Sequence, residues 1–219
     1  MKKPAYKSFY NLYVKRLFDI LISGAVLLLT WPLYLVISVA IVLETGFPVF
    51  YRAERGGYQN KTFKIMKFRS MVKNADKIGG GTTALNDSRI TKVGNILRKT
   101  KLDEIPQFIQ VFQGKLSIVG PRPELLKYTN QYKGEEKLIL QVRPGITDYS
   151  SIEFINLDEI VGGENADEMY EKYVLQRKNE LRIKYAKTVS FKTDAYIFMK
   201  TAFSVLEKAY GFIFKKEHR

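Results

Sequence analysis

The sequence predicts a helix-dominated α+β fold in two parts. One is a helix-break-helix hairpin that re-enters a membrane; the other is a cytoplasmic-side domain with a short β-hairpin and interfacial amphipathic helices. Three observations predict this fold. The 24 residues from Ile20 to Leu43 carry no charge, two short β-type segments follow them, and helical periodicity fills much of the second half of the chain. We expect the approach helix and hairpin to occupy residues 1–46, and the second domain residues 47–219.

The uncharged run is long enough to cross a membrane but is interrupted. As an unbroken helix it would extend about 36 Å, against a bilayer core of roughly 30 Å. Pro32 lies mid-run and removes a backbone donor, while the hydroxyls of Ser23 and Thr30 could satisfy backbone groups near a bend. We place the break at Thr30 and Pro32. Each limb would then measure about 18 Å, enough to reach mid-bilayer and return.

Basic residues on both sides of this run favour the re-entrant hairpin over the alternative, a kinked transmembrane helix. Five precede the run and four follow it: Lys2, Lys3, Lys7, Lys15 and Arg16, then Arg52, Arg55, Lys61 and Lys64. Positive flanks are retained on the cytoplasmic side of a membrane. A single span would place one of these two groups on the wrong side.

The remaining elements are predicted in chain order. Residues 7–18 are typical of an amphipathic approach helix, and residues 49–55 and 62–71 of two strands joined across 56–60. Further helices are expected over residues 93–97, 106–112, 164–186 and 191–214, with a short apolar stretch over 116–119. The last helix carries its apolar residues on one face. That pattern suits a helix in the headgroup plane of a membrane, and core packing is the alternative.

Composition excludes several classes of function. The chain has no cysteine, which excludes disulfide scaffolds, thiolate metal sites and cysteine nucleophiles. Its single histidine, His218, is expected in a solvated tail, which argues against a Ser-His-Asp triad or a His-based zinc site. The net charge of +14 suits nucleic acid, phospholipid headgroups or phosphorylated substrates, and charge alone does not choose among them.

Two adjacent carboxylates, Asp103 and Glu104, are the first candidate catalytic residues. They stand just before a helix that opens with Pro106, where the partial positive charge of a helix N-terminus favours an ionised carboxylate. An ionised aspartate can attack phosphorus, and its neighbour can hold a metal ion or accept a proton. Simple helix capping is the alternative interpretation.

Cationic residues are candidate phosphate ligands. Arg122 stands between two prolines, so its backbone is restricted and its guanidinium suits a bidentate phosphate contact. Arg143 precedes Pro144 in a similar setting, Lys67 and Arg69 share one face of a predicted strand, and Arg98 lies shortly before the carboxylates. Rigid turns and solvated lysines or arginines are the alternatives at each position.

Taken in order, these motifs resemble the bacterial sugar transferase family, the monotopic phosphoglycosyl transferases. The resemblance covers roughly residues 10–205 and matches the small form of the family. It is carried by the apolar run with Pro32 and by these segments: Lys15–Asp19, Lys67–Met71, Arg89–Gly94, Leu102–Gln107, Ser117–Pro123 and Arg143–Thr147.

The resemblance implies a function, a set of site residues and a location. Asp103 would attack the sugar-linked phosphate of a UDP-sugar and release UMP, and undecaprenyl (polyprenyl) phosphate would then take the phosphosugar from the aspartate. Such a reaction initiates the synthesis of membrane glycoconjugates or polysaccharides. The implied site comprises Asp103 and Glu104 as catalytic residues and Mg²⁺ ligands, with Lys67, Arg98, Arg122 and, less directly, Arg143 as substrate-binding cations. The implied location is the cytoplasmic face of the bacterial inner membrane, in contact with phospholipid.

The chain departs from the family pattern at two places, residues 148–151 and 158–167, and two other functions remain open. After Thr147 many members continue with glycine, whereas this chain has Asp148-Tyr149-Ser150-Ser151, and the segment 148–167 has no assignable role. A hydrolase of nucleotide sugars or lipid phosphates could share the acidic pair, and a non-enzymatic basic membrane adaptor would tolerate Asp103→Asn. The apolar run argues against nucleic-acid binding. The sequence identifies neither the sugar, the pathway nor the oligomeric state.

Overall fold

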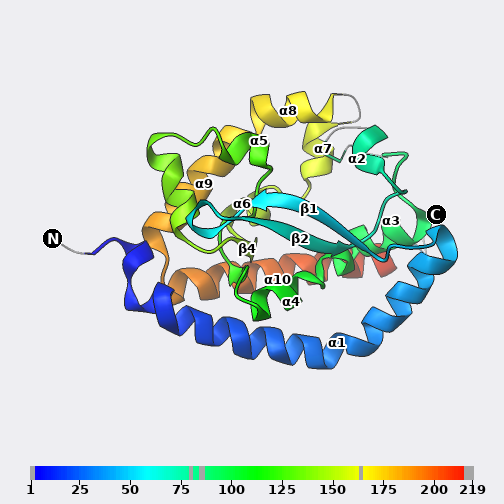
Figure 1. Cartoon of the computed structure of the whole chain (residues 1–219), viewed down its shortest axis with the longest axis horizontal. Helices are drawn as coiled ribbons and strands as arrows, with labels where there is room; N and C mark the ends of the chain where they lie inside the picture. Colours follow the sequence, from blue (N-terminus) through cyan, green and yellow to red (C-terminus); the bar gives the residue numbers. More distant parts are fainter. Residues whose placement is uncertain (1–2, 79–80, 84–86, 163–164, 215–219) are drawn as a thin grey trace.

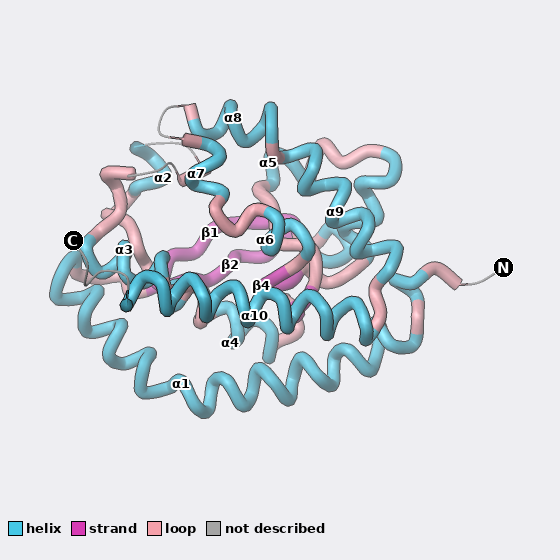
Figure 2. The backbone as a smooth tube through the Cα atoms, turned by 180° about the vertical axis from the view of Figure 1, so that it is seen from behind, coloured by secondary structure: helices cyan, strands magenta, loops and turns pink. Residues whose placement is uncertain are grey.

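The structure is a computed structural model that describes residues 3–78, 81–83, 87–162 and 165–214. His218 lies outside the described residues. A single long helix runs along one side of the molecule, and the polar domain lies above it (Figure 1). Seen from behind, the C-terminal helix α10 (Phe191–Phe214) crosses the same side of the domain above the long helix (Figure 2).

The long helix α1 spans Lys15–Thr45 and is preceded by a π-helical turn over Tyr10–Val14. The sequence predicts two limbs separated by a break, whereas the structure shows one continuous helix that bends and contains Pro32 (Figure 1). Proline removes only one backbone donor, so it bends this helix without ending it. The Thr30 hydroxyl donates to the Val26 carbonyl at 2.7 Å, as expected near the bend.

A β-hairpin forms the centre of the polar domain. Strands β1 (Phe50–Gly56) and β2 (Thr62–Phe68) pair antiparallel, with Phe50 opposite Phe68 and Gly56 opposite Thr62. The predicted strands are confirmed, although β2 ends three residues earlier than expected. A second, parallel pair joins β3 (Ser117–Val119) to β4 (Gly145–Thr147), and the sequence did not predict β4.

Short helices surround these strands. They are α2 (Ala75–Ile78), α3 (Lys92–Lys99), α4 (Gln107–Phe112), α5 (Leu126–Thr129), α6 (Tyr149–Glu153), α7 (Leu157–Val161), α8 (Ala166–Tyr173) and α9 (Leu175–Thr188). The 3-10 turns are η1 (Ala5–Lys7), η3 (Tyr58–Asn60), η4 (Leu102–Glu104) and η5 (Gly134–Gln141). The single helix predicted over 164–186 is therefore two helices, separated at the fully buried Val174.

Both ends of α1 are bonded to the polar domain. Near its start, Arg16 donates to the last carbonyls of α4 at 2.5 and 2.7 Å, and Asp19 accepts from the first two residues of β3 at 3.0 and 2.9 Å. Near its end, Glu44 accepts from the first two amides of α3 at 2.7 and 3.0 Å. The helix therefore leaves the domain and returns to it, with its bend between the two attachments.

Apolar side chains cover the outer side of α1. Tyr10–Thr45 is the one helix among the described residues that is long and apolar enough to cross a membrane. Leu28, Leu29 and Trp31, beside the bend, are 75%, 79% and 64% exposed. The inner side packs Ile37 and Ile41 against the hairpin and α3. An exposed apolar surface of this length suits lipid rather than water.

Candidate active site

The dyad occupies a 3-10 turn between two helices. Asp103 and Glu104 lie in η4, and Pro106 forms the N-cap of α4, as the sequence predicts. Lys101 begins the turn with a left-handed φ of 60°, which reverses the chain between α3 and the dyad. Asp103 is buried, and the Glu104 carboxylate lines a large cleft.

Glu104 is held by two cations from different elements. Lys67, on β2, donates to Glu104 Oε1 at 2.7 Å, and the Arg122 guanidinium donates to the same oxygen. Burial would raise the pKa of Glu104, but the charges of Arg122 and Lys67 more than offset it and hold that pKa well below its ordinary range. Glu104 is therefore an ionised carboxylate that orients two candidate phosphate ligands.

Asp103 has a different environment from the one expected for it. The sequence suggests a carboxylate kept ionised by the helix N-terminus, whereas burial raises the pKa of Asp103, with Lys67 as the largest opposing influence and Glu104 adding to the rise. The Lys67 ammonium lies 4.0 Å from Asp103 Oδ2. The α4 helix is six residues long, and its dipole does not outweigh desolvation at this buried site.

Arg122 owes its position to the close approach of β3 and β4. A side chain on Gly120 would lie 2.3 Å from the Arg143 carbonyl oxygen, and one on Gly145 would lie 2.1 Å from the Gly120 nitrogen, so only glycine fits at both places. One arm of the Arg122 guanidinium donates to the Ile146 carbonyl at 2.7 Å while the other reaches Glu104. The guanidinium therefore joins β4 to Glu104.

The other two predicted cations differ in position. Arg98, in the last turn of α3, lines the cleft, its charge favours ionised Asp103, and its guanidinium takes part in no hydrogen bond or ion pair within the described part of the chain. Arg143 does not line the cleft; its guanidinium lies 5.4 Å from the centre of the Tyr58 ring. The structure therefore brings Lys67, Arg98 and Arg122 to the dyad but not Arg143.

Two side chains fix the dyad relative to the hairpin and to α1. Gln110 of α4 accepts from the Met66 amide at 2.8 Å and donates to the Lys64 carbonyl at 2.6 Å, which fastens α4 to β2. Tyr34, two residues after Pro32, donates to the Ile105 carbonyl at 2.9 Å. The turn that carries Asp103 therefore rests directly on α1.

The cleft is large and strongly cationic. Its volume is about 1960 Å³, above the roughly 300–1,000 Å³ of a site for one small ligand. Among the described residues, thirteen lysines and arginines line it against three carboxylates. Such a cleft can accommodate two phosphorylated substrates and attract both.

Sequence reasoning missed a second charged network beside Arg122. Asp148, fully buried, accepts from the Arg122 backbone at 3.0 Å and lies 3.8 Å from Arg182 Nε. Arg182 donates to Glu124 at 3.1 Å, and Tyr170 donates to the same carboxylate at 2.5 Å. Asp148 begins the segment where the chain departs from the family pattern, and that departure was the only available signal.

Asp103 and Glu104 fit the way proteins hold Mg²⁺. This ion is usually bound through one or two carboxylates together with substrate phosphates, not by a cage of protein ligands. The described residues contain no group of three or more His, Cys, Asp or Glu side chains able to hold a metal. Within the described residues, the second oxygen of Glu104 and the Asp103 carboxylate accept no hydrogen bond, so these oxygens remain as possible metal ligands.

Comparison with known proteins gives one consistent result. The sequence model of the bacterial sugar transferase family matches residues 10–208. A UDP-glucose:undecaprenyl-phosphate glucose-1-phosphate transferase of Klebsiella pneumoniae is 37% identical over 213 residues, covering 95% of this chain and 42% of that protein. A UDP-N-acetylgalactosamine-undecaprenyl-phosphate N-acetylgalactosaminephosphotransferase of Aeromonas hydrophila is 34% identical over 203 residues, covering 89% and 44%.

A third relative matches over most of both chains. It is an uncharacterized sugar transferase of Bacillus subtilis, 34% identical over 194 residues, which are 88% of this chain and 87% of that protein. The chain thus spans less than half the length of the first two relatives.

Proposed function

Because this chain belongs to the bacterial sugar transferase family, we propose that it transfers a sugar-1-phosphate from a UDP-sugar to polyprenyl phosphate and releases UMP. Two relatives are named for transfer of this kind to undecaprenyl phosphate. The observation that carries the proposal is the contact of Lys67 and Arg122 with Glu104, directly beside Asp103 in a cationic cleft.

In the proposed first step, an oxygen of Asp103 attacks the phosphorus attached to the sugar. A bond forms between that oxygen and phosphorus, the bond to the bridging oxygen breaks, and UMP leaves with the electron pair. Lys67 lies between Asp103 and Glu104 and stabilises the ionised form of the nucleophile. Arg122 and Arg98 supply charge for the phosphate oxygens as negative charge develops on them.

In the second step, an oxygen of polyprenyl phosphate attacks the same phosphorus. The new bond gives a polyprenyl diphosphate sugar, and Asp103 leaves as a carboxylate. Asp103 and Glu104 would hold Mg²⁺, which neutralises diphosphate charge when bound. Lys67 is fixed on β2, and Arg122 is fixed just beyond β3 by its bond to the Ile146 carbonyl, so the site keeps its place between the two steps.

The lipid substrate requires the site to lie at a membrane surface. We infer that α1 is seated in one leaflet with its bend innermost, and that α10 lies in the headgroup layer. Two features support this: the exposed apolar side of α1, and the exposed Phe191, Phe203 and Leu206 of α10, which are 58%, 69% and 69% exposed. UDP-sugars are cytoplasmic metabolites, so the enzyme would face the cytoplasm as a monotopic protein of the inner membrane.

The test is UMP release by detergent-solubilised protein supplied with a panel of UDP-sugars and Mg²⁺. Without lipid, we expect a burst of about one UMP per enzyme, and continuous release once polyprenyl phosphate is added. Mass spectrometry of the trapped enzyme should show a phosphosugar on the peptide that contains Asp103, and Asp103→Asn should abolish both signals. Continuous release without lipid would identify a hydrolase, and a fully active Asp103→Asn variant would remove Asp103 from the mechanism.

A further inference from the structure

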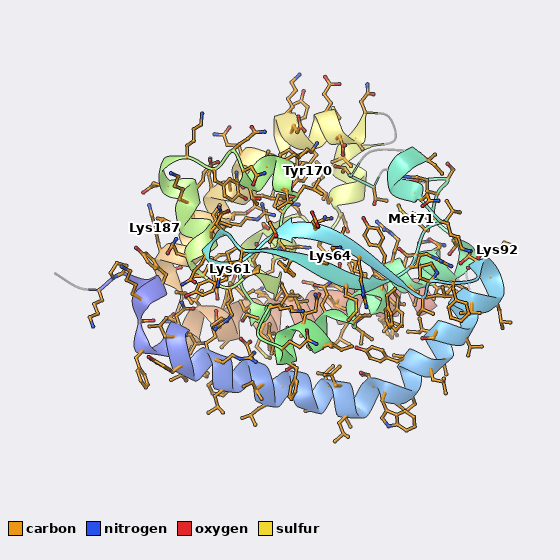
Figure 3. The ribbon with its side chains drawn as sticks, in the orientation of Figure 1. Lys61, Lys64, Met71, Lys92, Tyr170 and Lys187 are labelled. Atoms are coloured by element: carbon orange, nitrogen blue, oxygen red, sulfur yellow. The ribbon has the colours of Figure 1, made fainter. Side chains whose placement is uncertain are left out.

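A lysine without a charged partner lines the cleft beyond Arg122. Lys178, on α9, is 8% exposed, and its ammonium takes part in no hydrogen bond or ion pair within the described residues. Its Nζ lies 4.8 Å from the ring centre of Tyr170 and 5.7 Å from that of Phe154. Tyr170 is a buried residue of α8 and is labelled between that helix and β1 in Figure 3.

Arg182, the neighbouring cation, does have charged partners. Arg182, one turn further along α9, is bonded to Glu124 at 3.1 Å and lies 3.8 Å from Asp148. Glu124 and Asp148 also act on Lys178 electrostatically, but both pair with Arg182, and within the described residues the ammonium of Lys178 forms an ion pair with neither. A buried charge without a charged partner costs free energy, and aromatic rings compensate only part of that cost.

The position of Lys178 relates it to the reacting phosphate. Asp148 joins the Arg122 backbone to Arg182, so α9 and the dyad belong to one connected network. Lys178, Tyr170 and Phe154 line the same cleft as Glu104 and Arg122. A donor whose phosphate lies at Arg122 would extend its remaining parts along this cleft.

The departure from the family pattern and the names of the relatives both direct attention to the side of the cleft that holds Lys178. The chain departs from the family pattern at residues 148–151, of which Ser150 and Ser151 line the same cleft as Phe154. The relatives from Klebsiella and Aeromonas are named for different sugars but for the same lipid acceptor. The sugar is the part of the donor that differs among relatives. We expect it to contact the part of the cleft that departs from the shared motifs.

We propose that Lys178, between Tyr170 and Phe154, binds an oxygen of the donor's sugar ring and selects the sugar. The ammonium donates to a hydroxyl, amide carbonyl or carboxylate oxygen, and the two aromatic rings contact the apolar C–H faces of the sugar. This inference rests on the proposed function, because it names the site for one portion of the donor.

The test compares Lys178→Met with wild type in the full-length protein. Methionine keeps the length of the side chain and removes its charge. We measure kcat/KM for UDP-glucose, UDP-galactose and their N-acetylated counterparts. For the preferred donor we expect a loss of roughly 10- to 150-fold, the effect of one charged hydrogen bond. For the poorest donors we expect less than a threefold loss, so that discrimination narrows. Lys178→Gln, which keeps an N–H donor, should restore part of the discrimination between donors.

A matched control and a binding measurement complete the test. Lys187→Met changes another lysine of the same helix, which lies at the left of the molecule and away from Tyr170 in Figure 3, and should leave every rate unchanged. The thermal shift produced by UDP alone should be the same in Lys178→Met and wild type, whereas the additional shift produced by the UDP-sugar should disappear.

Other outcomes would overturn the inference. Equal losses for all donors, together with weaker binding of UDP, would place Lys178 on a phosphate. Unchanged donor ratios and unchanged thermal shifts would remove it from the site. If wild type releases no UMP from any donor, the proposed function fails, and the thermal shifts still decide whether Lys178 contacts the sugar.

Discussion

At the scale of single residues, the contacts of Glu104 explain how two long side chains are ordered at the proposed phosphate site. Lys67 and Arg122 come from different elements and meet on one oxygen atom. Long cationic side chains normally lose rotamer freedom when they bind a ligand. Because Glu104 already orders both, much of that entropy has been lost before a phosphate arrives, and the cost of substrate binding falls.

Arg122→Ala should therefore lower kcat/KM by roughly 10- to 150-fold, the loss of one charged hydrogen bond. Arg122→Lys should recover only part of the activity, because lysine cannot hold Ile146 and Glu104 at once. Arg122→Ala should also move the acid limb of the pH–rate profile to higher pH, because the charge of Arg122 is the largest influence that lowers the pKa of Glu104. If kcat/KM of Arg122→Ala is within twofold of the wild-type value, Arg122 is only a structural residue of the turn.

Lys178 gives a pH dependence of stability with a definite sign. Burial, reinforced by the charge of Arg182 and opposed by Glu124, lowers the pKa of Lys178 to about 8. The unfolded chain keeps this proton up to pH about 10.4, so folding carries a penalty of about 3 kcal/mol below pH 8 that disappears as pH rises towards 10. Lys178→Met should unfold at a higher temperature than wild type at pH 7, and this advantage should shrink above pH 8.

The control for this measurement is Lys187→Met. Lys187 is paired with Glu135 at the surface, so its replacement should change the unfolding temperature little and equally at every pH. A constant difference between Lys178→Met and wild type from pH 7 to 10 would mean that Lys178 is not a destabilised buried cation.

Sequence reasoning identifies some of these residues and misses others for physical reasons. Asp103, Glu104 and Arg122 lie in short segments with unusual local chemistry, so order and spacing pick them out. Lys178 lies in a helix rich in charged residues, where any lysine would be expected to be solvated. Its burial depends on Tyr170 and Phe154 folding over it, and helical periodicity contains no information about that contact.

At the scale of elements, local signals predict the hairpin and α4 but not where helices break. Two β-type segments around a glycine-rich turn specify β1 and β2 without help from the rest of the fold. The interruption between α8 and α9 at Val174 carries no proline or glycine; it coincides with a residue that is completely buried against the core. Tertiary packing sets that boundary, as it does for three-residue β4, which exists only because β3 lies beside it.

The contact between α1 and the dyad turn predicts an effect on rate. Tyr34→Phe keeps the ring that packs on Phe68 and removes the hydrogen bond to Ile105. The loss of about 1 kcal/mol should lower kcat by about fivefold while KM for the UDP-sugar changes little. Ser38→Ala, which removes a hydroxyl bonded only within α1, is the matched control. If Tyr34→Phe and Ser38→Ala lower kcat equally, Tyr34 acts through the stability of the helix alone.

At the scale of the whole molecule, the attachments of α1 restrict its topology more strongly than its composition does. Two flanking cations serve the fold: Lys15 pairs with Asp194 of α10 at 2.6 Å, and Arg16 bonds to α4. A straight helix of 31 residues would separate its ends by about 46 Å. Instead Arg16 and Glu44, near opposite ends, both bond to one polar domain.

A polar domain cannot lie on both sides of a bilayer, so the two ends of α1 should face the same side. Lys3 precedes α1, Lys61 follows it, and both are exposed. Because the chain has no cysteine of its own, a single cysteine can be placed at either position. We expect both cysteines to be accessible from the same side of the membrane. A membrane-impermeant thiol reagent should label neither site in intact spheroplasts and both after lysis. The basic flanks agree with this, because moving either group outward opposes the positive-inside bias. Labelling of the Lys3 position alone in sealed cells would mean that α1 crosses the membrane, and the bonds that join Glu44 to α3 and Arg16 to α4 could not both exist there.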